Sequence, residues 1–418
     1  MGEELDVISI SNPKNGWEGA EMTQHEKILQ KAGDLKQTII DLRRDFHQHP
    51  EVGLRTFDTA GKVEKFLKEL GIETKLLTNG AGVHGYLKGG SPGKTFALRA
   101  DIDALPLQEE NDVPYKSANP GVMHGCGHDA HTAMLLGAAM ILSEWKNELK
   151  GNVVFVFQPA EETGEGAKAM VEEGVLEGVD AIFGIHVSST FDSGTLGYRI
   201  GPLMAAGDFF DVKITGKGGH GALPHEAIDP IVIAVNAINA LQTIVSREVS
   251  PLESAVISIC KMEAGKGAYN VIPDSATFGG TLRSQTPEMR EYLPKRVKDI
   301  LDGIVPAMRG RYEFNLMHRF PPTINDEKMI SFVVRISREM LGEEKVFEMK
   351  PMMGSEDFSY YLERIPGAFA FFGVKNTGKG IIYPHHHPRF DVDEEMLPIG
   401  TALDVAVAME YLQGKEAW

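Results

Sequence analysis

Cysteine is nearly absent from this chain of 418 residues, which holds only Cys126 and Cys260. Two cysteines cannot build a disulfide framework, so a reducing compartment, the cytoplasm, is the expected location. The sequence also lacks any run of about 18 or more apolar residues, so no membrane-spanning helix is expected. An excess of positive charge is missing too. The formal net charge is −17, which argues against nucleic acid or an anionic membrane surface as the partner.

Residues 1–23 lack the basic start and the long apolar stretch of a signal peptide. We interpret them as a flexible N-terminal extension and assign them no function. The rest of the composition is ordinary for a soluble globular protein, with 42% hydrophobic and 24% charged residues. A chain of this length is expected to fold as two or more domains.

One short segment is unusually rich in groups that bind metals. Val122–Ala133 reads VMHGCGHDAHTA and holds a thiol, three imidazoles and a carboxylate within eight residues. An apolar run with helical spacing follows it directly, from Met134 to Leu142. The polar groups are therefore expected at a loop-to-helix junction, where the positive end of the helix dipole favours thiolate and carboxylate. Metal ligation is the predicted role of this segment.

Further polar side chains follow three apolar runs that we predict to be buried strands. Thr95–Ala100 is followed by Asp101 and Asp103, Val153–Phe157 by Glu161 and Glu162, and Ala181–Ile185 by His186. An open α/β sheet places its chemistry at the carboxyl ends of its strands, so these side chains are expected to converge. Taken singly, the aspartates could cap a turn and His186 could be a buried structural residue. The repeated placement favours a shared site.

The elements expected between residues 202 and 320 follow the order β-α-β-β-α-β, which is that of a ferredoxin-like unit. We predict an inserted α+β domain over 202–320. The flanking segments 24–201 and 321–418 would together form one α/β domain that carries the polar strand ends. Helices are expected near 24–48, 56–70, 327–340, 356–363 and 394–412.

Histidines outside these segments carry weaker signals. His47 and His49 would lie on different faces of a helix, which favours a structural role. His385, His386 and His387 are consecutive and lie in a loop, because prolines bracket them. A plain surface position is the alternative for these three. A ligand role is favoured because the predicted ligand set still lacks a member.

Thiolate, imidazole and carboxylate together favour a borderline transition metal, because Mg²⁺ and Ca²⁺ prefer oxygen ligands. Five or six candidate ligands are too many for one tetrahedral ion and suit two ions that share a bridge. Two such ions can activate a water molecule and polarise a carbonyl. The adjacent Glu161 and Glu162 are expected to point apart, so that one could bind metal while the other acts as general base.

These motifs resemble the M20 metallopeptidase family, and most closely its amidohydrolase branch of aminoacylases, hippurate hydrolases, related bacterial carboxypeptidases and plant auxin-conjugate hydrolases. The resemblance spans about residues 25–415. The segments that carry it are His124–His131, Gln158–Glu162, Gly184–His186, Gly219-His220 and His386–Pro388. It implies a catalytic domain with two divalent ions (Zn, Mn, Co or Ni) and a lid domain that often dimerises, so a homodimer or higher homo-oligomer through the lid is expected.

The resemblance also implies a role for individual residues. Glu161 would be the general base, and Asp103 would orient the metal site without binding it. His220 in the lid would stabilise the oxyanion, often in the partner subunit's site, while Asn270 and Arg283 would grip the substrate. The implied metal ligands are Cys126 (as the bridge), His128, Glu162, His186 and His386. His124, His385 and His387 receive no role.

The expected activity is metal-dependent hydrolysis of the amide bond of N-acyl amino acids or related small-molecule conjugates. A carboxypeptidase or dipeptidase acting on short peptides is the alternative among enzymes, because specificity for the acyl side depends on pocket shape. A metal-stabilised binding protein and a purely structural oligomer are the alternatives outside catalysis. The binding protein would require a missing base or ligand, and none is missing here. The structural oligomer predicts that removal of metal by a chelator leaves every activity intact.

Overall fold

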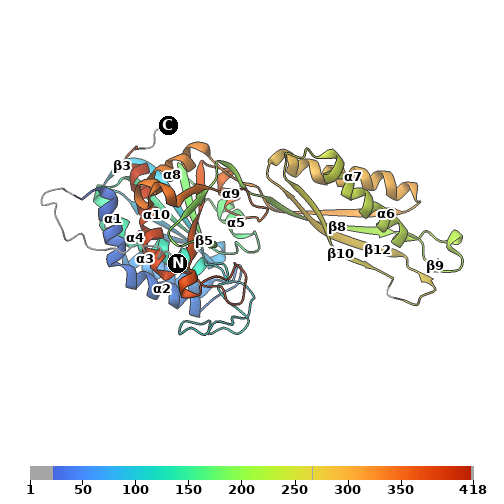
Figure 1. Cartoon of the computed structure of the whole chain (residues 1–418), viewed down its shortest axis with the longest axis horizontal. Helices are drawn as coiled ribbons and strands as arrows, with labels where there is room; N and C mark the ends of the chain where they lie inside the picture. Colours follow the sequence, from blue (N-terminus) through green and yellow to red (C-terminus); the bar gives the residue numbers. More distant parts are fainter. Residues whose placement is uncertain (1–21, 266, 416–418) are drawn as a thin grey trace, which may run out of the picture.

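The computed structural model of the chain describes residues 22–265 and 267–415. A larger α/β domain carries a smaller, elongated lid domain that projects from one side (Figure 1). Of the extension predicted for residues 1–23, residues 1–21 lie outside the described residues. Thr23 is described, and it caps the first helix through a reciprocal pair of hydrogen bonds with Glu26.

The larger domain is built on an eight-stranded mixed sheet with the strand order β1-β2-β4-β3-β5-β16-β6-β15. Its strands are β1 (Glu73–Leu77), β2 (Gly82–Lys88), β3 (Ser91–Asp101), β4 (Lys150–Gln158), β5 (Ala181–Asp192), β6 (Leu196–Tyr198), β15 (Val346–Glu348) and β16 (Gly367–Lys375). The central strands β4, β3, β5 and β16 run parallel. Their apolar residues are buried on both faces, as is usual for parallel strands.

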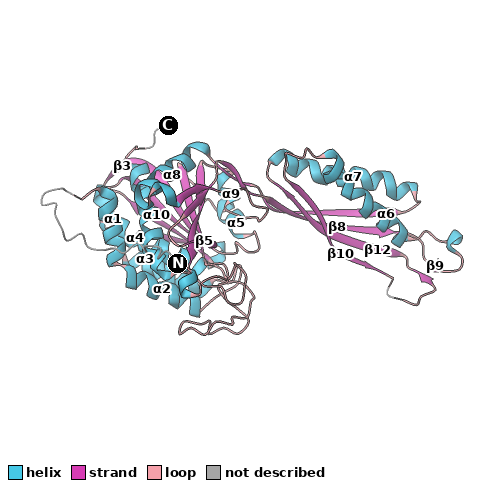
Figure 2. Ribbon diagram, viewed as in Figure 1, coloured by secondary structure: helices cyan, strands magenta, loops and turns pink. Residues whose placement is uncertain are grey.

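Helices cover both faces of this sheet (Figure 2). The two faces have separate cores, one formed with α1, α2, α3, α4, α8 and α10 and the other with α5 and α9. The helices are α1 (Gln24–Asp34), α2 (Lys36–Gln48), α3 (Phe57–Glu69), α4 (His128–Glu144), α5 (Gly166–Glu172), α8 (Glu327–Leu341), α9 (Ser359–Leu362) and α10 (Leu397–Leu412). The α/β class predicted for this domain is confirmed.

The strand register brings the polar strand ends level with one another. Asp101 on β3 pairs with Gln158 on β4, and Arg99 pairs with Gly184 on β5. His186, two residues beyond Gly184, therefore lies beside Asp101. The sequence placed His186 at the end of its strand, and this was wrong. β5 continues to Asp192 because β16 pairs with it along that length.

The lid has the ferredoxin-like topology predicted for it. Its antiparallel sheet has the order β10-β12-β8-β13, and two helices pack on one face around a separate core. The elements are β8 (Ala206–Thr215), α6 (Pro230–Thr243), β10 (Ala255–Ala264), β12 (Ser275–Ser284), α7 (Pro287–Ala307) and β13 (Arg311–Phe320). At the end of the lid far from the larger domain, β9 (Gly219–His220) pairs with β11 (Val271–Ile272) (Figure 1).

The two chain crossings between the domains run side by side, because β7 (Gly201–Met204) pairs with β14 (Thr323–Asn325). Within the described residues, one helical segment, Pro230–Glu248, is long and apolar enough to cross a membrane by length and composition. It consists of α6 and the π-helical turn that follows. Its buried residues pack in the lid core, while Val232 and Val235 are exposed.

Two predicted helices differ from the structure. The helix expected over 24–48 is broken at Leu35, whose backbone leaves the helical region between α1 and α2. The helix expected over 356–363 begins only at Ser359. Glu356 and Asp357 precede it in a loop, because their carboxylates bind groups of the buried sheet rather than facing solvent as helix side chains.

Candidate metal centre

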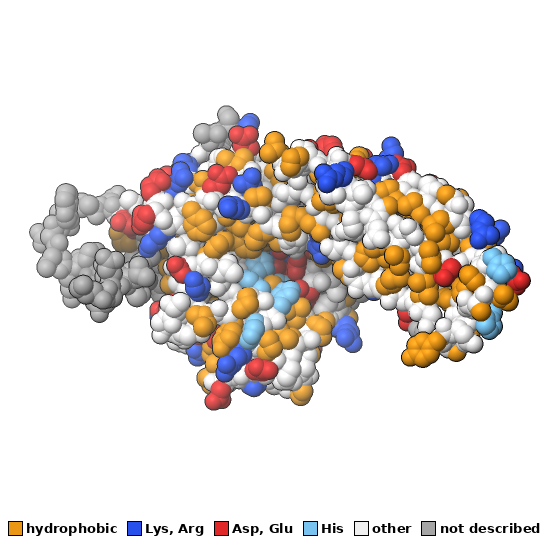
Figure 3. Space-filling view, turned by 45° about the vertical axis from the view of Figure 1, so that its right-hand side comes forward, with side chains coloured by type: hydrophobic (Ala, Val, Ile, Leu, Met, Phe, Trp, Pro, Cys, Tyr) orange, Lys and Arg blue, Asp and Glu red, His pale blue; other side chains and the backbone are white. Residues whose placement is uncertain are grey.

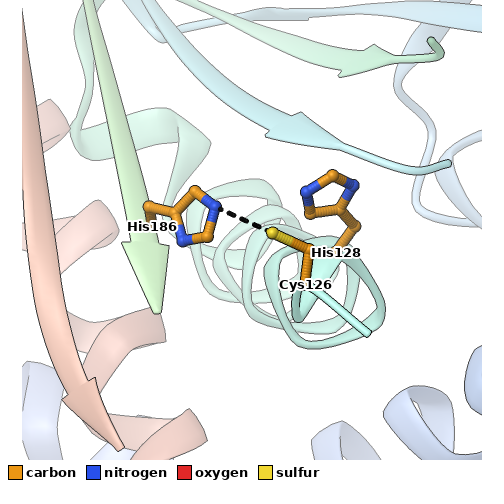
Figure 4. Close-up of side chains that lie close together, drawn as sticks. All are labelled: Cys126, His128 and His186. Carbon is orange, nitrogen blue, oxygen red and sulfur yellow. Dashed lines mark hydrogen bonds between the residues drawn. The ribbon is translucent and has the colours of Figure 1, made fainter. Parts of the chain in front are cut away.

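Cys126 and His128 flank the start of α4, and the backbone there requires glycine. Gly127 has a φ of +90°, and a side-chain carbon at this position would lie 2.3 Å from the side chain of Val187. This tight turn places Cys126 and His128 on the same side of the helix start, facing His186 on β5 (Figure 4). The thiol and both imidazoles are buried.

In both His186 and His128, one ring nitrogen donates to a backbone carbonyl and the other has no such partner. Nδ1 of His186 donates to the carbonyl of Val187 at 2.7 Å, while its Nε2 lies 3.6 Å from Sγ of Cys126. Burial, together with nearby His131 and His385, holds the pKa of His186 well below its usual value, so Nε2 presents a lone pair. Nδ1 of His128 donates to the carbonyl of Asp103 at 2.8 Å. Nε2 of His128 is buried without any hydrogen-bond partner.

A second group of three ligands shares the same thiol. Cys126, Glu162 and His386 each offer one atom, and the three atoms lie within 4.8 Å of one another. Nε2 of His386 is 3.3 Å from Oε1 of Glu162. Cys126, His128 and His186 form the other group under the same distance limit. The structure therefore brings all five predicted ligands together as two triads, with Cys126 common to both.

The electrostatics of the site fit divalent cations. Four carboxylates act on the thiol, those of Glu161, Glu162, Asp101 and Glu356. Burial together with mutual repulsion raises the pKa of Glu161, Glu356 and Asp357. The pKa of the Cys126 thiol is also raised, by burial and by nearby glutamates. Asp101 and Asp103 outweigh the burial of His128 and raise its pKa to about 10. A divalent cation would stabilise the ionised forms of the thiol and of these carboxyl groups, and the soft thiolate with imidazoles selects a transition metal.

Asp103 organises the loop that carries the two glutamates. Its carboxylate accepts the backbone N–H of Glu161 at 3.0 Å and that of Glu162 at 3.4 Å. The turn into this loop needs a left-handed backbone at Ala160, whose φ is +55°. As expected for neighbours, the two glutamates have different partners. Oε2 of Glu161 is 4.0 Å from Nε2 of His128, whereas Glu162 faces His386.

A buried network of ion pairs and hydrogen bonds around Arg99, which we did not predict, lies beside the site. The guanidinium of Arg99 donates to Gln158 and contacts the carboxylates of Asp101, Glu356 and Asp357. All of these side chains are buried. An arginine inside an otherwise apolar strand was the available signal for this network. The acidic pair Glu356-Asp357 gave none, because it was assigned to a helix.

The remaining polar residues of the opening motif hold the backbone. His131 donates from Nδ1 to Asp101 and accepts the N–H of Val187 on Nε2, so neither nitrogen is free for metal. Asp129 pairs with Arg43 and His47, which tie the start of α4 to α2. This agrees with the structural role predicted for His47. Both ring nitrogens of His124 are buried without a partner, and burial lowers its pKa to about 3.

The lid residues lie in two places. His220 and Asn270 are neighbours at the far tip of the lid, where the N–H of Gly221 donates to the carbonyl of Asn270. Their own subunit's metal centre lies in the larger domain, away from this tip, so this subunit alone does not bring them to it. Arg283 lies instead at the base of the lid and donates to the hydroxyl of Ser355, next to Glu356. Figure 3 shows histidine and acidic side chains gathered in a recess beside the lid.

Comparison with known proteins agrees with this geometry. The family model for peptidase family M20/M25/M40 matches residues 97–410. The chain is 46% identical to IAA-amino acid hydrolase ILR1-like 4 of Arabidopsis thaliana over 98% of this chain and 93% of that protein. It is 41% identical to thermostable carboxypeptidase 2 of Saccharolobus solfataricus, over 92% of this chain and 98% of that protein.

Among solved structures, the chain resembles the YXEP protein of Bacillus subtilis, described as a dinuclear metal-binding peptidase of the M20 family. The TM-score is 0.81 at 37% identity, over 91% of this chain and 99% of that one. The two relatives are thus named as hydrolytic enzymes, and the solved structure is described as binding two metal ions. The chain is a metal-dependent amidohydrolase that belongs to the M20/M25/M40 peptidase family.

Proposed function

We propose that this protein hydrolyses the amide bond of N-acyl amino acids or related amino-acid conjugates. The observation that carries the proposal is the pair of ligand triads joined through Cys126, with the carboxylate of Glu161 next to them and in neither triad. The relative named as an IAA-amino acid hydrolase covers nearly the whole chain and supports this substrate class.

Two divalent ions fit the donor set, with Cys126 as the bridge. Cys126, His128 and His186 would hold one ion, while Cys126, Glu162 and His386 would hold the other. Zn²⁺, Mn²⁺, Co²⁺ and Ni²⁺ are the candidates, and the thiolate favours the softer ones. When bound, such ions lower the pKa of water and polarise the substrate carbonyl.

Glu161 is suited to move the proton. Burial and the neighbouring Glu356 and Glu162 raise its pKa, which makes it a stronger base than an exposed glutamate. It would take a proton from the attacking water and deliver it to the amide nitrogen as the C–N bond breaks. The products are a carboxylic acid and a free amino group. Asp103 keeps Glu161 in place through its backbone N–H.

Arg283 would bind the carboxylate of the amino-acid part of the substrate. Its guanidinium is half-buried, has an ordinary hydrogen bond only to Ser355 among the described residues, and contacts no carboxylate at ion-pair distance. Burial therefore lowers its pKa, and a substrate carboxylate would supply the missing negative charge. Because Ser355 belongs to the larger domain, Arg283 lies where the lid meets that domain.

A homodimer through the lid would complete the site. The outer edge of β10 is unpaired within the described lid sheet, and α6 beside it exposes Val232 and Val235 with no charged residue along its length. Pairing of two such edges would cover both features. It would also let His220 and Asn270 at the lid tip reach the partner subunit's metal centre. A thiolate ligand requires a reduced cysteine, which suits the cytoplasm.

The test separates catalysis from metal binding alone. Glu161→Gln should keep both ions, because Glu161 belongs to neither triad, but should lose about 10²–10⁴-fold in kcat. Glu172→Gln on the exposed surface of α5 is the matched control and should keep parental kcat. Metal content by elemental analysis and hydrolysis of N-acetyl amino acids give the two readouts.

Two results would contradict the proposal. Parental hydrolysis by Glu161→Gln would remove Glu161 as the base. Hydrolysis that survives complete removal of metal by a chelator would remove the metal centre from the reaction. The carboxypeptidase alternative is favoured by the relative from Saccharolobus solfataricus. It predicts faster cleavage of unblocked short peptides than of N-acyl amino acids by the same preparation.

A further inference from the structure

Two consecutive histidines reach the same thiol, although only His386 belongs to a ligand triad. Nδ1 of His385 lies 3.7 Å from Sγ of Cys126. Neighbouring side chains usually point apart, but His386 has a left-handed backbone with a φ of +63°. Its N–H donates to the carbonyl of Gly125 at 2.8 Å, which fastens this loop to the loop of Cys126. The loop thus holds both imidazoles against the thiol.

The hydrogen bonds of His385 determine which of its nitrogens carries the proton. The backbone N–H of Ser189 donates to Nε2 of His385 at 3.3 Å, so Nε2 must offer its lone pair. In a neutral imidazole the proton is then on Nδ1. That N–H is directed at the sulfur of Cys126. A hydrogen bond from Nδ1–H to the sulfur satisfies both nitrogens.

A role as a further metal ligand does not fit this arrangement. A ligand must present a bare Nδ1, which would place the proton on Nε2 and turn it against the N–H of Ser189. Packing alone does not explain the residue either. The ring of His385 contacts the rings of Phe390 and His186, with centroids 5.1 Å and 5.2 Å away. An apolar side chain could make the same contacts, so they do not account for an N–H next to the sulfur.

We propose that His385 is a positioning residue that donates an Nδ1–H···S hydrogen bond to the bridging thiolate of Cys126. The inference rests on the proposed two-metal function and deepens it. The bond would hold the sulfur between the two triads. Because the imidazole donates to the sulfur, it would also draw electron density from it. His387 has no such contact. Its ring stacks on Tyr383, with centroids 4.5 Å apart.

Cobalt reports on the sulfur directly, through the near-ultraviolet charge-transfer band from thiolate to Co²⁺. The metal-free parent, His385→Leu, His385→Asn and the control His387→Asn would each be titrated with Co²⁺. In His385→Leu the band should move to longer wavelength, because the sulfur loses its hydrogen bond, and Co²⁺ affinity should fall about 10-fold or more. The amide N–H of Asn occupies the place of Nδ1–H, so His385→Asn should restore the parental band.

Each other outcome would overturn the inference. An unchanged band in His385→Leu would show that His385 only fills space. Visible cobalt bands that change in His385→Leu as for a lost ligand, and that His385→Asn does not restore, would indicate that His385 binds the metal. If Leu fails to fold, a shifted band in His385→Asn alone would also contradict donation. Absence of any thiolate band in the parent would instead refute the proposed metal centre itself, so the two failures are distinguishable.

Discussion

The carboxylate of Asp103 accepts the backbone N–H of Glu161 at 3.0 Å, and this bond joins the end of one strand to the loop after the next. The same carboxylate lies 3.5 Å from Nδ1 of His128. Asp103 therefore touches the proposed base and a metal ligand, although the structure gives it no place in either triad. Asp103 is thus a residue that positions Glu161 and His128.

Replacement of Asp103 by Asn should lower kcat or metal affinity about 10- to 100-fold, the usual effect of losing a group that orients metal ligands. The amide cannot accept both backbone N–H groups as a carboxylate does, so the loop of Glu161 and Glu162 should loosen. Steady-state kinetics and metal content measure the effect. Asp112→Asn on the exposed surface is the control. A variant at Asp103 with parental kcat and parental metal content would exclude the positioning role.

Arg283→Gln should weaken the use of substrates with a free carboxylate. A charge-assisted hydrogen bond is worth about 1.5–3 kcal/mol, so kcat/KM should fall about 10- to 100-fold. The loss should be much smaller for the same substrate with its carboxylate converted to a carboxamide. Arg311→Gln, at an exposed end of β13, is the matched control. An equal loss on both substrates would mean that Arg283 supports the contact between the lid and the larger domain through Ser355 rather than binding substrate.

Subunit mixing tests whether His220 acts across a dimer. Glu161→Gln and His220→Ala should each be nearly inactive alone. If subunits exchange and His220 serves the partner's centre, one site of each mixed dimer regains both groups, so an equal mixture should reach about one quarter of parental activity. No recovery after proven exchange would place His220 in its own subunit's reaction or outside it. A monomer in sedimentation with full activity would also refute the role across the interface.

Local motifs predicted most of the site, because each ligand lies in a short segment with its own signal. Cys126 and His128 flank a glycine turn, and Glu162 follows a buried strand. What local sequence could not show is how separate loops approach one another. Glu356, for example, binds Arg99 from a segment 257 residues away in sequence. The hydrogen bond of His385 depends on the N–H of Ser189, which is likewise 196 residues away.

In the lid, too, the order of the helices and strands could be predicted from the sequence, whereas the position of its residues relative to the metal centre could not. The β-α-β-β-α-β order could be predicted from periodicity, and the sheet order follows from it. The positions of His220 and Asn270 relative to the metal centre could not, because they depend on a long lid that carries its tip away from its own site. Helix ends were also misjudged where a carboxylate has a buried partner, as at Glu356.

The last prediction concerns stability away from the metal centre. Glu410 on α10 is buried between two basic partners, with Oε1 2.6 Å from Nε2 of His25 and Oε2 2.8 Å from Nη2 of Arg335. Burial alone would raise the pKa of Glu410, but these partners outweigh it and lower the pKa to about 2. The unfolded chain therefore binds this proton more readily than the folded one. The stabilisation is complete above the unfolded value and is lost as pH falls toward about 2.

Glu410→Gln should accordingly lower the free energy of unfolding at about pH 7, and the gap to the parent should narrow as pH falls from about 5 to 3. Urea unfolding of the metal-free proteins at a series of pH values measures this, since metal release at low pH would otherwise dominate. Glu344→Gln, on an exposed turn, should match the parent throughout. A gap that stays constant across this range would show that Glu410 stabilises the fold by packing and not as a carboxylate.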